Sequence, residues 1–463
     1  MFIGREKELK ELKERYDSPR LELGVIYGAR RIGKTYLINR SLDGRRHISF
    51  LASDTTEKDN RSLFSQKINE FLGLPLDYIY PTFKQILDVV VEQAKKQTLI
   101  LFIDELPFLA KTYPQIINLI QGVINDNQEV NLKIILSGSD YSFMEEILKN
   151  KSKPLYQRAT FQIKLEQFSF SEAVQMLNGL DNETIINTLS VFGPHPFYLS
   201  MIDKSKSFED NIKSLFFSKF GTLINAPYLT LPLSWGNSGI YITIYQAISH
   251  RINKLSDIAT HIGILPNQLS TYITKLSNSE ILEKKEMFNA GQKNNYYDIK
   301  DRLLKFYYSF VYPHLSSISE GLGESVYEIE KNNINLFVSK SFENVVIDYL
   351  SEQNLMRKLD SIYEPFKSLN VDNSKLGRSI QIDAISKSIV DDNKLIVVEA
   401  KYRDKNTSLE VLNHLVESAS VFSDYKDKQY YIFSKTGFSD DLLSAKKDNI
   451  HLIKMSDMLK NSK

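Results

Sequence analysis

The chain has 463 residues, more than one ordinary hydrophobic core holds, so we expect several domains. Its 42% hydrophobic and 25% charged residues fit a globular protein, and a formal net charge of +1 gives no long-range attraction to DNA or acidic membranes. Cysteine is absent, which excludes disulfides and thiolate chemistry; with no apolar run near the roughly 20 residues of a membrane span, we expect a cytoplasmic protein with no membrane partner.

The first motif is a phosphate-binding loop between a strand and a helix. Residues 2–9 open an amphipathic helix, residues 21–27 form a predicted buried strand, and residues 28–35 fit the pattern G-x-x-x-x-G-K-[ST]. Backbone N–H groups of such a loop surround a phosphate in front of a helix N-terminus. Lys34 is expected on the β- and γ-phosphates, and Thr35 on Mg²⁺. The nucleotide-binding residues expected in this loop are Gly28, Ala29, Arg30, Arg31, Ile32, Gly33, Lys34 and Thr35. A chance glycine turn is the alternative, which the correct flanks disfavour.

Two further apolar runs predict the rest of the nucleotide site. Residues 98–103 lead into Asp104 and Glu105, and residues 132–136 lead to Ser139. Continuous apolar runs are typical of parallel strands covered on both faces, whose ligands lie at the strand C-termini. Asp104 is expected to hold Mg²⁺, Glu105 to orient or deprotonate the attacking water, and Ser139 to contact the γ-phosphate. Because Glu105 is present, we expect hydrolysis as well as binding.

The chain divides into five expected segments. The nucleotide-binding core spans residues 1–165, and apolar residues at helical spacing predict a helical lid over 166–234. Residues 235–300 are expected to form a winged helix, and residues 301–334 an aromatic-rich helical connector. Residues 335–463 combine helices and strands into a small α/β domain. The expected fold class is therefore multidomain α/β, with a parallel sheet around the phosphate-binding loop.

The predicted winged helix has a nearly balanced charge. Its presumed recognition helix, residues 267–276, offers polar side chains and Lys275 to a groove, whereas Asp257, Glu280, Glu283 and Glu286 carry negative charge elsewhere in the segment. A winged helix that binds DNA usually shows a basic face. Contact with DNA and a role in packing against neighbouring domains therefore remain open as alternatives.

Paired carboxylates mark the last segment. Asp383 and Glu399 lie on neighbouring predicted strands, and Lys401 follows two residues after Glu399. Positions i and i+2 of a strand share a face, so Glu399 and Lys401 point the same way. Asp383 and Glu399, with Glu343 from a preceding helix, could hold Mg²⁺ that activates water, while Lys401 orients that water. The alternative is ordinary solvent exposure at the end of a strand.

These motifs resemble those of a known family. Residues 2–9, the loop at 28–35 and residues 103–107 are similar to the archaeal-type ATPase family, a branch of the signal-transducing (STAND) P-loop ATPases close to AAA+ proteins. Residues 154–158 and 193–199 match its later motifs. The C-terminal part resembles the domain often fused to this family, a PD-(D/E)XK nuclease-like fold of the restriction-endonuclease type.

The resemblance implies further roles. Arg158 is implied as a sensor or finger for the γ-phosphate, with a surface salt bridge as the alternative. The turn that contains Pro196 is implied to lie near the nucleotide, and Gly4 and Arg5 near the adenine. ATP is the nucleotide that the resemblance implies. The chain departs from the family pattern at three positions, which are Gln157, Arg302 and Gln381; the last removes an acidic residue near Asp383.

Two hypotheses of function follow. In the first, ATP binding and hydrolysis control a Mg²⁺-dependent nuclease at the C-terminus that acts on DNA. Glu105 is then the catalytic residue of ATP hydrolysis, and Asp383, Glu399 and Lys401 are the catalytic residues of the nuclease. In the second, the protein is a nucleotide-driven signalling or scaffold switch whose last domain binds a partner or nucleic acid without cleaving it. A second copy of the chain and a protein trigger are candidate partners in both.

Overall fold

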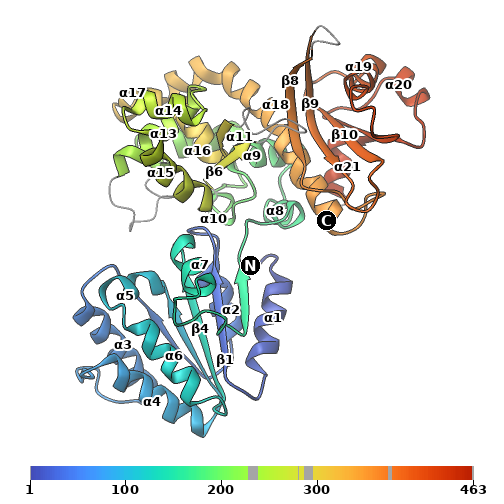
Figure 1. Ribbon diagram of the computed structural model, residues 1–463. Coiled ribbons are helices and arrows are strands. Elements are labelled where there is room, and N and C mark those ends of the chain that lie inside the picture. The colour runs from blue at the N-terminus through green and yellow to red at the C-terminus, as the bar shows by residue number, and fades with distance from the viewer. Residues whose placement is uncertain (1, 228–237, 280, 286–295, 374–377, 461–463) are drawn as a thin grey trace. The chain divides into compact units, whose positions relative to one another are not determined.

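The computed structural model describes residues 2–227, 238–279, 281–285, 296–373 and 378–460 (Figure 1). They form two compact units. The first unit comprises Phe2–Glu166. The second comprises the described residues that begin at Gln167 and, after the gap, those from Gly239 onward. The predicted lid border at residue 234 lies outside the described residues, as do Glu280 and Glu286 of the predicted winged helix.

The first unit contains a five-stranded sheet of order β2-β3-β4-β1-β5, in which every pairing is parallel. This confirms the predicted parallel sheet. Its three inner strands are buried along their whole length and are mostly apolar, because helices cover both faces. The strands are β1 (Glu22–Tyr27), β2 (His47–Leu51), β3 (Leu99–Asp104), β4 (Leu132–Gly138) and β5 (Phe161–Lys164).

Alternate strand residues face two separate cores. Val25 contributes to one core with helices α3 to α7, whereas Ile26 contributes to the other core with α1 and α2. This alternation follows from the two-residue period of a strand. The helices are α1 (Glu6–Tyr16), α2 (Lys34–Leu42), α3 (Glu57–Leu72), α4 (Phe83–Lys96), α5 (Leu106–Thr112), α6 (Ile116–Asp126) and α7 (Tyr141–Lys149).

The second unit opens with short helices. A hydrogen-bonded capping box starts the first of them, in which Ser169 accepts from the Glu172 N–H and the Glu172 carboxylate accepts from the Ser169 N–H. These helices are α8 (Phe170–Met176), α9 (Asn182–Phe192), α10 (Pro196–Leu199) and α11 (Phe208–Phe216). They occupy the segment in which we expect a lid, and the lid itself stays a prediction.

Three helices and a hairpin follow. The second helix ends at Gly263, whose φ of 80° lies in the left-handed region, as the predicted glycine stop requires. The two strands pair antiparallel. This order of elements is the one expected for a winged helix, and the winged helix itself stays a prediction. The elements are α13 (Ser238–Ser249), α14 (Leu255–Ile262), α15 (Pro266–Asn278), β6 (Leu282–Lys285) and β7 (Tyr296–Ile299).

One long helix spans the predicted border between connector and C-terminal domain. Short helical segments, α16 (Arg302–Phe306), η3 (Tyr307–Val311), η4 (Tyr312–His314) and α17 (Leu315–Ser319), lead to α18 (Gly323–Leu355), which has 33 residues. The predicted border at residue 334 therefore falls inside α18. Residues 324–355 contain neither glycine nor proline, so nothing in the sequence interrupts the helix there.

The C-terminal sheet is mixed, with the order β12-β11-β10-β9-β8. Strands β10, β11 and β12 are parallel, whereas β8 and β9 add antiparallel. The predicted strands correspond to β9 (Arg378–Lys387), β10 (Lys394–Lys401) and β11 (Asp427–Ser434), and the predicted helix to α19 (Leu409–Ala419). The edge strands β8 (Lys367–Asn373) and β12 (Ile450–Lys454), with α20 (Asp440–Ser444) and α21 (Met455–Lys460), are additional. Among the helices that the structure describes, none is long and apolar enough to cross a membrane.

Candidate functional site

The loop at residues 28–35 connects β1 to α2, as the sequence predicts. Gly28 has no room for a side chain, since a Cβ there would stand 2.2 Å from the Leu165 carbonyl oxygen. Arg31 (φ 61°) and Gly33 (φ 97°) adopt left-handed backbone conformations, which turn the chain so that α2 begins at Lys34. The N-terminus of α2 therefore points its N–H groups into the loop, a geometry suited to an anion.

Lys34 lies inside this loop. It is 5% exposed, and its Nζ donates to the carbonyl oxygens of Gly28 at 3.0 Å and Ala29 at 2.9 Å. Burial lowers the pKa of the Lys34 ammonium, and the carboxylates of Glu105 and Asp104 offset part of that effect. The ammonium is thus held by the loop itself, at the position from which it can reach a bound phosphate.

Asp104 lies at the end of the site where we expect Mg²⁺, and three groups donate to its carboxylate. Thr35 Oγ1 donates to Asp104 Oδ2 at 2.6 Å, and the Glu105 N–H donates to Oδ1 at 3.0 Å. The Ser137 hydroxyl also donates to Oδ1. All three groups that contact the Asp104 carboxylate are donors, so together they fix its orientation. The structure thus brings together Thr35 and Asp104, the two residues predicted to hold Mg²⁺. Ser137 was not predicted; its position at the end of β4, beside Asp104 at the end of β3, was the available signal.

Glu105 and Ser139 are in direct contact. Glu105 Oε2 accepts hydrogen bonds from the Ser139 N–H at 3.1 Å and from the Ser139 hydroxyl at 2.9 Å. Glu105 itself has a left-handed backbone (φ 52°) at the start of α5. Ser139, predicted to contact the γ-phosphate, therefore restrains the carboxylate predicted to act on water. Because both bonds hold Oε2, a rotation of the Glu105 side chain has to break at least one of them.

We expect Ser139→Ala to raise the basal turnover number for ATP about tenfold without changing KM, because one hydrogen bond to the Glu105 carboxylate is lost, and a hydrogen bond to a charged group is worth about 1.5 kcal/mol or more. Steady-state hydrolysis assays measure both constants. Ser139→Thr keeps the hydroxyl and should behave like the wild type. A fall in turnover in the alanine variant would instead mean that Ser139 acts on the phosphate.

Arg5 fastens the start of the chain to the loop. It is 6% exposed, and its guanidinium donates to the carbonyl oxygens of Glu166 at 2.5 Å and Ile32 at 3.5 Å. Gly4 and Arg5 both have φ of 65°, which turns the backbone just before α1. The two residues therefore lie beside the phosphate-binding loop, and their contact with adenine stays a prediction.

Arg158 lies at the end of the sheet where the strands start, away from the phosphate-binding loop that it was predicted to approach. It is exposed and stands two residues before Thr160, whose N–H donates to the Leu23 carbonyl at 2.9 Å near the start of β1. The phosphate-binding loop follows the other end of β1. A strand rises about 3.3 Å per residue, so the length of β1 separates the two places. Arg158 therefore does not contact the γ-phosphate site of its own chain. Pro196 begins α10 in the second unit, and its proximity to nucleotide stays a prediction.

The predicted carboxylates of the C-terminal domain are buried on adjacent strands. Asp383 on β9 is 5% exposed and Glu399 on β10 is 8% exposed. Asp383 Oδ2 accepts from the Ala400 N–H at 2.8 Å, and the Lys401 ammonium pairs with Glu399. Burial, reinforced by Glu399 and Glu343, raises the pKa of Asp383 well above its usual value. Burial and then Glu399 also raise the pKa of Glu343 on α18.

The structure brings these groups close enough to interact electrostatically, but it does not assemble the predicted metal site. Among the described residues, no group of three or more His, Cys, Asp or Glu side chains is arranged to hold a metal ion. The physical reason is that both carboxylates are already engaged, since Asp383 on β9 accepts from an N–H group of the neighbouring strand β10 and Glu399 pairs with the ammonium of Lys401 on its own strand. A metal site made of Glu343, Asp383 and Glu399 stays a prediction that requires these bonds to open.

A cavity of about 440 Å³ adjoins Glu399 and Lys401. Its wall also contains three basic side chains that the sequence analysis did not identify, Arg403, Lys405 and His414. The close spacing of Lys401, Arg403 and Lys405 was the available signal, although residues 403–405 form a bend after β10 and do not continue the strand. Because cations outnumber acids along this wall, the cavity suits an anionic ligand.

The comparison with known families identifies the N-terminal domain. Residues 2–201 match the family of ATPase domains found predominantly in Archaea. The N-terminal part of this chain belongs to that ATPase family. Residues 307–412 match a second family, described as archaeal and bacterial proteins of unknown function. The predicted resemblance to a two-part archaeal-type ATPase is thereby confirmed, whereas the second family's description contains no nuclease.

Individual relatives are also uncharacterized. The protein MJECL04 of Methanocaldococcus jannaschii is 28% identical over 411 residues, which cover 87% of this chain and 88% of the relative. The ATP-binding protein MJ0423 of the same organism is 37% identical over 46 residues, 10% of this chain and 78% of that protein. Among solved structures, the Aeropyrum pernix ORC2 protein in its ADPNP–ADP complexes matches with a TM-score of 0.40 and 13% identity over 68% of this chain and 94% of that one. A STAND protein with a tetratricopeptide repeat sensor from Pyrococcus horikoshii matches with a TM-score of 0.31 and 15% identity, covering 78% of this chain and 48% of that chain.

Proposed function

We propose that this ATPase binds and hydrolyses ATP with Mg²⁺ and that its nucleotide state controls a C-terminal domain that cleaves DNA. The observation that carries the first part is the hydrogen bond between Thr35 and Asp104 beside the buried Lys34. A hydroxyl and a carboxylate at the mouth of a phosphate-binding loop are the ligands that a nucleotide-bound Mg²⁺ takes.

Each side chain has one task in hydrolysis. The α2 N-terminus and Lys34 bind the phosphates, and Thr35 and Asp104 would hold Mg²⁺, which offsets charge on the γ-phosphate. Glu105 accepts a proton from the attacking water or orients it, with its carboxylate held by the two hydrogen bonds that Ser139 donates to Oε2. Ser137 keeps the Asp104 carboxylate oriented throughout.

We expect Lys34→Ala to lose ATP binding, because no other cation is buried inside the loop among the residues that the structure describes. Glu105→Gln should keep ATP binding and lose hydrolysis, with a fall in turnover of about a hundredfold or more. Equilibrium binding of a fluorescent ATP analogue and phosphate release distinguish the two variants. Equal hydrolysis by Glu105→Gln and wild type would exclude Glu105 as the base.

Arg158 acts, in this proposal, on a nucleotide bound to a second copy of the chain. It is exposed at the edge of the sheet opposite to its own phosphate-binding loop, so it cannot serve that loop. A cation supplied to the γ-phosphate from a neighbouring subunit stabilises the charge of the transition state. A second copy is thus the partner that this residue implies. We further assign α8–α11 to the predicted lid and α13–α15 with β6–β7 to the predicted winged helix.

The proposed nuclease site uses Asp383, Glu399 and Lys401. With the Ala400 N–H and Lys401 displaced, the two carboxylates and Glu343 would hold Mg²⁺, which supplies an activated water. Lys401 then orients that water or meets the charge that develops on the phosphate. The basic side chains Arg403 and Lys405 along the cavity support a phosphodiester substrate, since guanidinium and ammonium groups bind phosphates.

We expect Lys401→Ala to abolish Mg²⁺-dependent cleavage of DNA and to leave ATP hydrolysis unchanged. Lys426→Ala, which removes the same charge from an exposed turn, is the matched control and should cleave normally. Gel assays with ATP, ADP or no nucleotide measure cleavage and its dependence on nucleotide. Cleavage that persists in Lys401→Ala would show that the activity has another source.

A second candidate function rests on the same geometry. In the structure both Asp383 and Glu399 are engaged by groups of β10, while the basic wall of the cavity stays open to an anion. In this alternative the C-terminal domain binds nucleic acid or an acidic partner without cutting, and ATP switches that binding. Absence of cleavage by the wild type, together with nucleotide-dependent DNA binding, would favour this alternative.

The proposed coupling between the two activities has a structural route. Tyr402, next to Lys401, donates from its hydroxyl to Asn187 Oδ1 on α9 at 2.5 Å. Lys435, after β11, pairs with Glu183 on α9 at 2.7 Å. Helix α9 lies within the residues that match the ATPase family. A displacement of α9 would therefore pull directly on the chain that carries Glu399 and Lys401.

We expect Asn187→Ala to keep ATP hydrolysis and to reduce the difference that ATP makes to DNA binding or cleavage. One hydrogen bond worth about 1 kcal/mol corresponds to about a fivefold loss of coupling. Asn182→Ala, on the exposed start of the same helix, is the control. Paired measurements of DNA affinity with ATP and with ADP give the coupling; an unchanged ratio in Asn187→Ala would contradict this route.

A further inference from the structure

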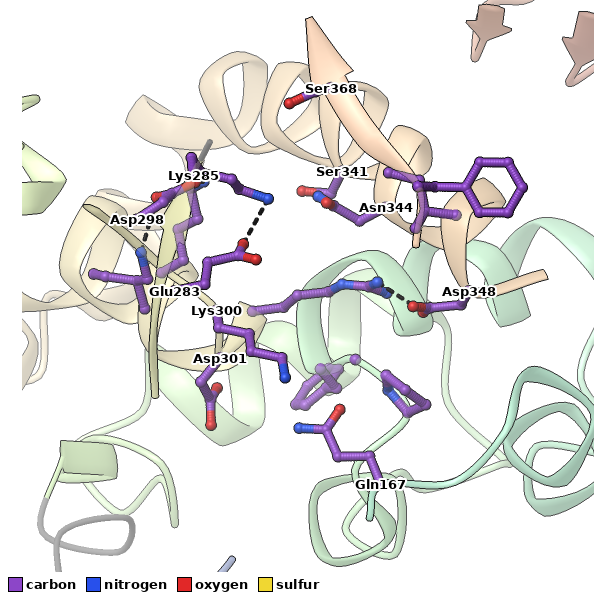
Figure 2. A pocket seen from close by; sticks show the side chains of 18 of the residues that line it. Gln167, Glu283, Lys285, Asp298, Lys300, Asp301, Ser341, Asn344, Asp348 and Ser368 are labelled. Atoms are coloured by element: carbon purple, nitrogen blue, oxygen red, sulfur yellow. Dashed lines mark hydrogen bonds and ion pairs between the residues drawn. The ribbon is translucent and has the colours of Figure 1, made fainter. Parts of the chain in front are cut away.

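The second unit contains a cavity of about 300 Å³ that the proposed ATPase and nuclease sites do not use (Figure 2). It lies between the hairpin β6–β7, α16, the turn after α9, α18 and β8. Its wall includes residues of the motif at 193–199 and of the segment 298–301, where β7 ends. Tyr198 of the motif donates to Asp301 Oδ2 at 3.1 Å. The motif and the end of the hairpin therefore meet at this cavity.

The wall of the cavity carries excess positive charge. Four acidic side chains line it, and each has a donor close by. Lys285 pairs with Glu283 at 2.6 Å, Lys305 with Asp298 at 2.6 Å and Arg302 with Asp348 at 2.7 Å. The fourth, Asp301, accepts from the Leu304 N–H at 3.0 Å as well as from Tyr198. Against these four acids stand six basic residues, an excess of two: Lys284, Lys285, Lys300, Arg302, Lys305 and Lys367.

Neutral polar groups also face the cavity. Ser341 and Asn344 lie one turn apart on α18, and Figure 2 shows both side chains on the wall across from Lys285. Ser341 is 7% exposed. Within the described part of the chain, neither side chain forms a hydrogen bond to the protein. A buried hydroxyl and an amide that face a cavity without a protein partner need water or a ligand.

We propose that this cavity binds a small organic phosphate. An excess of two positive charges matches the charge of a phosphate monoester, for which lysine ammonium groups are suitable partners. Ser341 and Asn344 can exchange hydrogen bonds with hydroxyl or carbonyl groups of the organic part. A volume of about 300 Å³ lies at the small end of ligand pockets, which suits a sugar phosphate or a mononucleotide. This site lies in the second unit and does not depend on the proposed function.

Bound phosphate would connect elements that are far apart in sequence. Lys285 and Lys300 belong to the β6–β7 hairpin and the residue after it, whereas Asn344 belongs to α18. A ligand that contacts all three stabilises the second unit by binding the folded form alone. We therefore expect ligand binding to raise the unfolding temperature of the protein.

The test is calorimetric titration of the full chain with AMP and with ribose 5-phosphate. Every protein carries Lys34→Ala, so that the phosphate-binding loop does not contribute. We expect one site per chain, no binding of ribose without phosphate, and at least about a tenfold loss of affinity in Asn344→Leu, which removes the amide and fills the cavity. Asn332→Leu, exposed on the same helix, is the control and should bind as its parent does.

Two results would overturn the proposal. One is absence of binding of AMP, ribose 5-phosphate and inorganic phosphate to the parent protein up to about 10 mM. The other is equal affinity in Asn344→Leu and Asn332→Leu, which would place the phosphate elsewhere. Should Asn344→Leu fail to fold by circular dichroism, Ser341→Ala, which removes one hydroxyl, takes its place in the comparison. Binding of inorganic phosphate alone, without added affinity for the organic part, would also contradict an organic ligand.

Discussion

The carboxylate of Asp104 is the group on which the nucleotide site depends. Its two oxygens accept hydrogen bonds from Thr35 on α2, from Ser137 at the end of β4 and from the backbone of Glu105 before α5. These three elements meet only because β3 and β4 are adjacent and parallel, with α2 following the next strand, β1. The Asp104 carboxylate is 3% exposed, and its hydrogen-bonding oxygens are satisfied inside the protein because all three partners are donors. One buried carboxylate thus sets the positions of the residues proposed to bind metal and of the residue proposed to activate water.

In the second unit the corresponding constraint is helix α18. Its carboxylates bind two neighbouring segments, since Glu352 accepts from the Ser171 N–H at 3.0 Å and Asp348 pairs with Arg302. The same helix carries Glu343, which contributes to raising the pKa of Asp383. It also carries Ser341 and Asn344, which line the cavity proposed to bind an organic phosphate. Segments predicted as a lid, a connector and a C-terminal domain are therefore held by one continuous helix. A displacement of one of these segments therefore acts on the others through the packing of α18.

Arg302 shows how a departure from a family pattern can acquire a structural role. The resemblance leads us to expect proline after Asp301, and the arginine there donates to the Leu189 carbonyl on α9 at 3.1 Å and pairs with Asp348 on α18. Proline could make neither contact, because it carries no side-chain donor. In this chain the residue joins three helices, and its aliphatic part packs over Gly193.

The sequence by itself determined the elements whose signals are local. Continuous apolar runs specified the inner strands of the parallel sheet, and the glycine and lysine pattern of residues 28–35 specified the loop, because backbone turns and burial leave their marks within a few residues. Alternation around residue 383 likewise predicted β9. Only the tertiary structure decided the positions that depend on which strands become neighbours. It placed Arg158 at the end of the sheet away from the phosphate-binding loop, Ser137 on Asp104, Ser139 on Glu105, and both the Asp383 and the Glu399 side chains on groups of β10. The edge strands β8 and β12 and the full length of α18 also required the structure. An edge strand buries less apolar surface and shows a weaker pattern, and contacts between distant segments follow from strand order and packing, which a linear pattern does not encode.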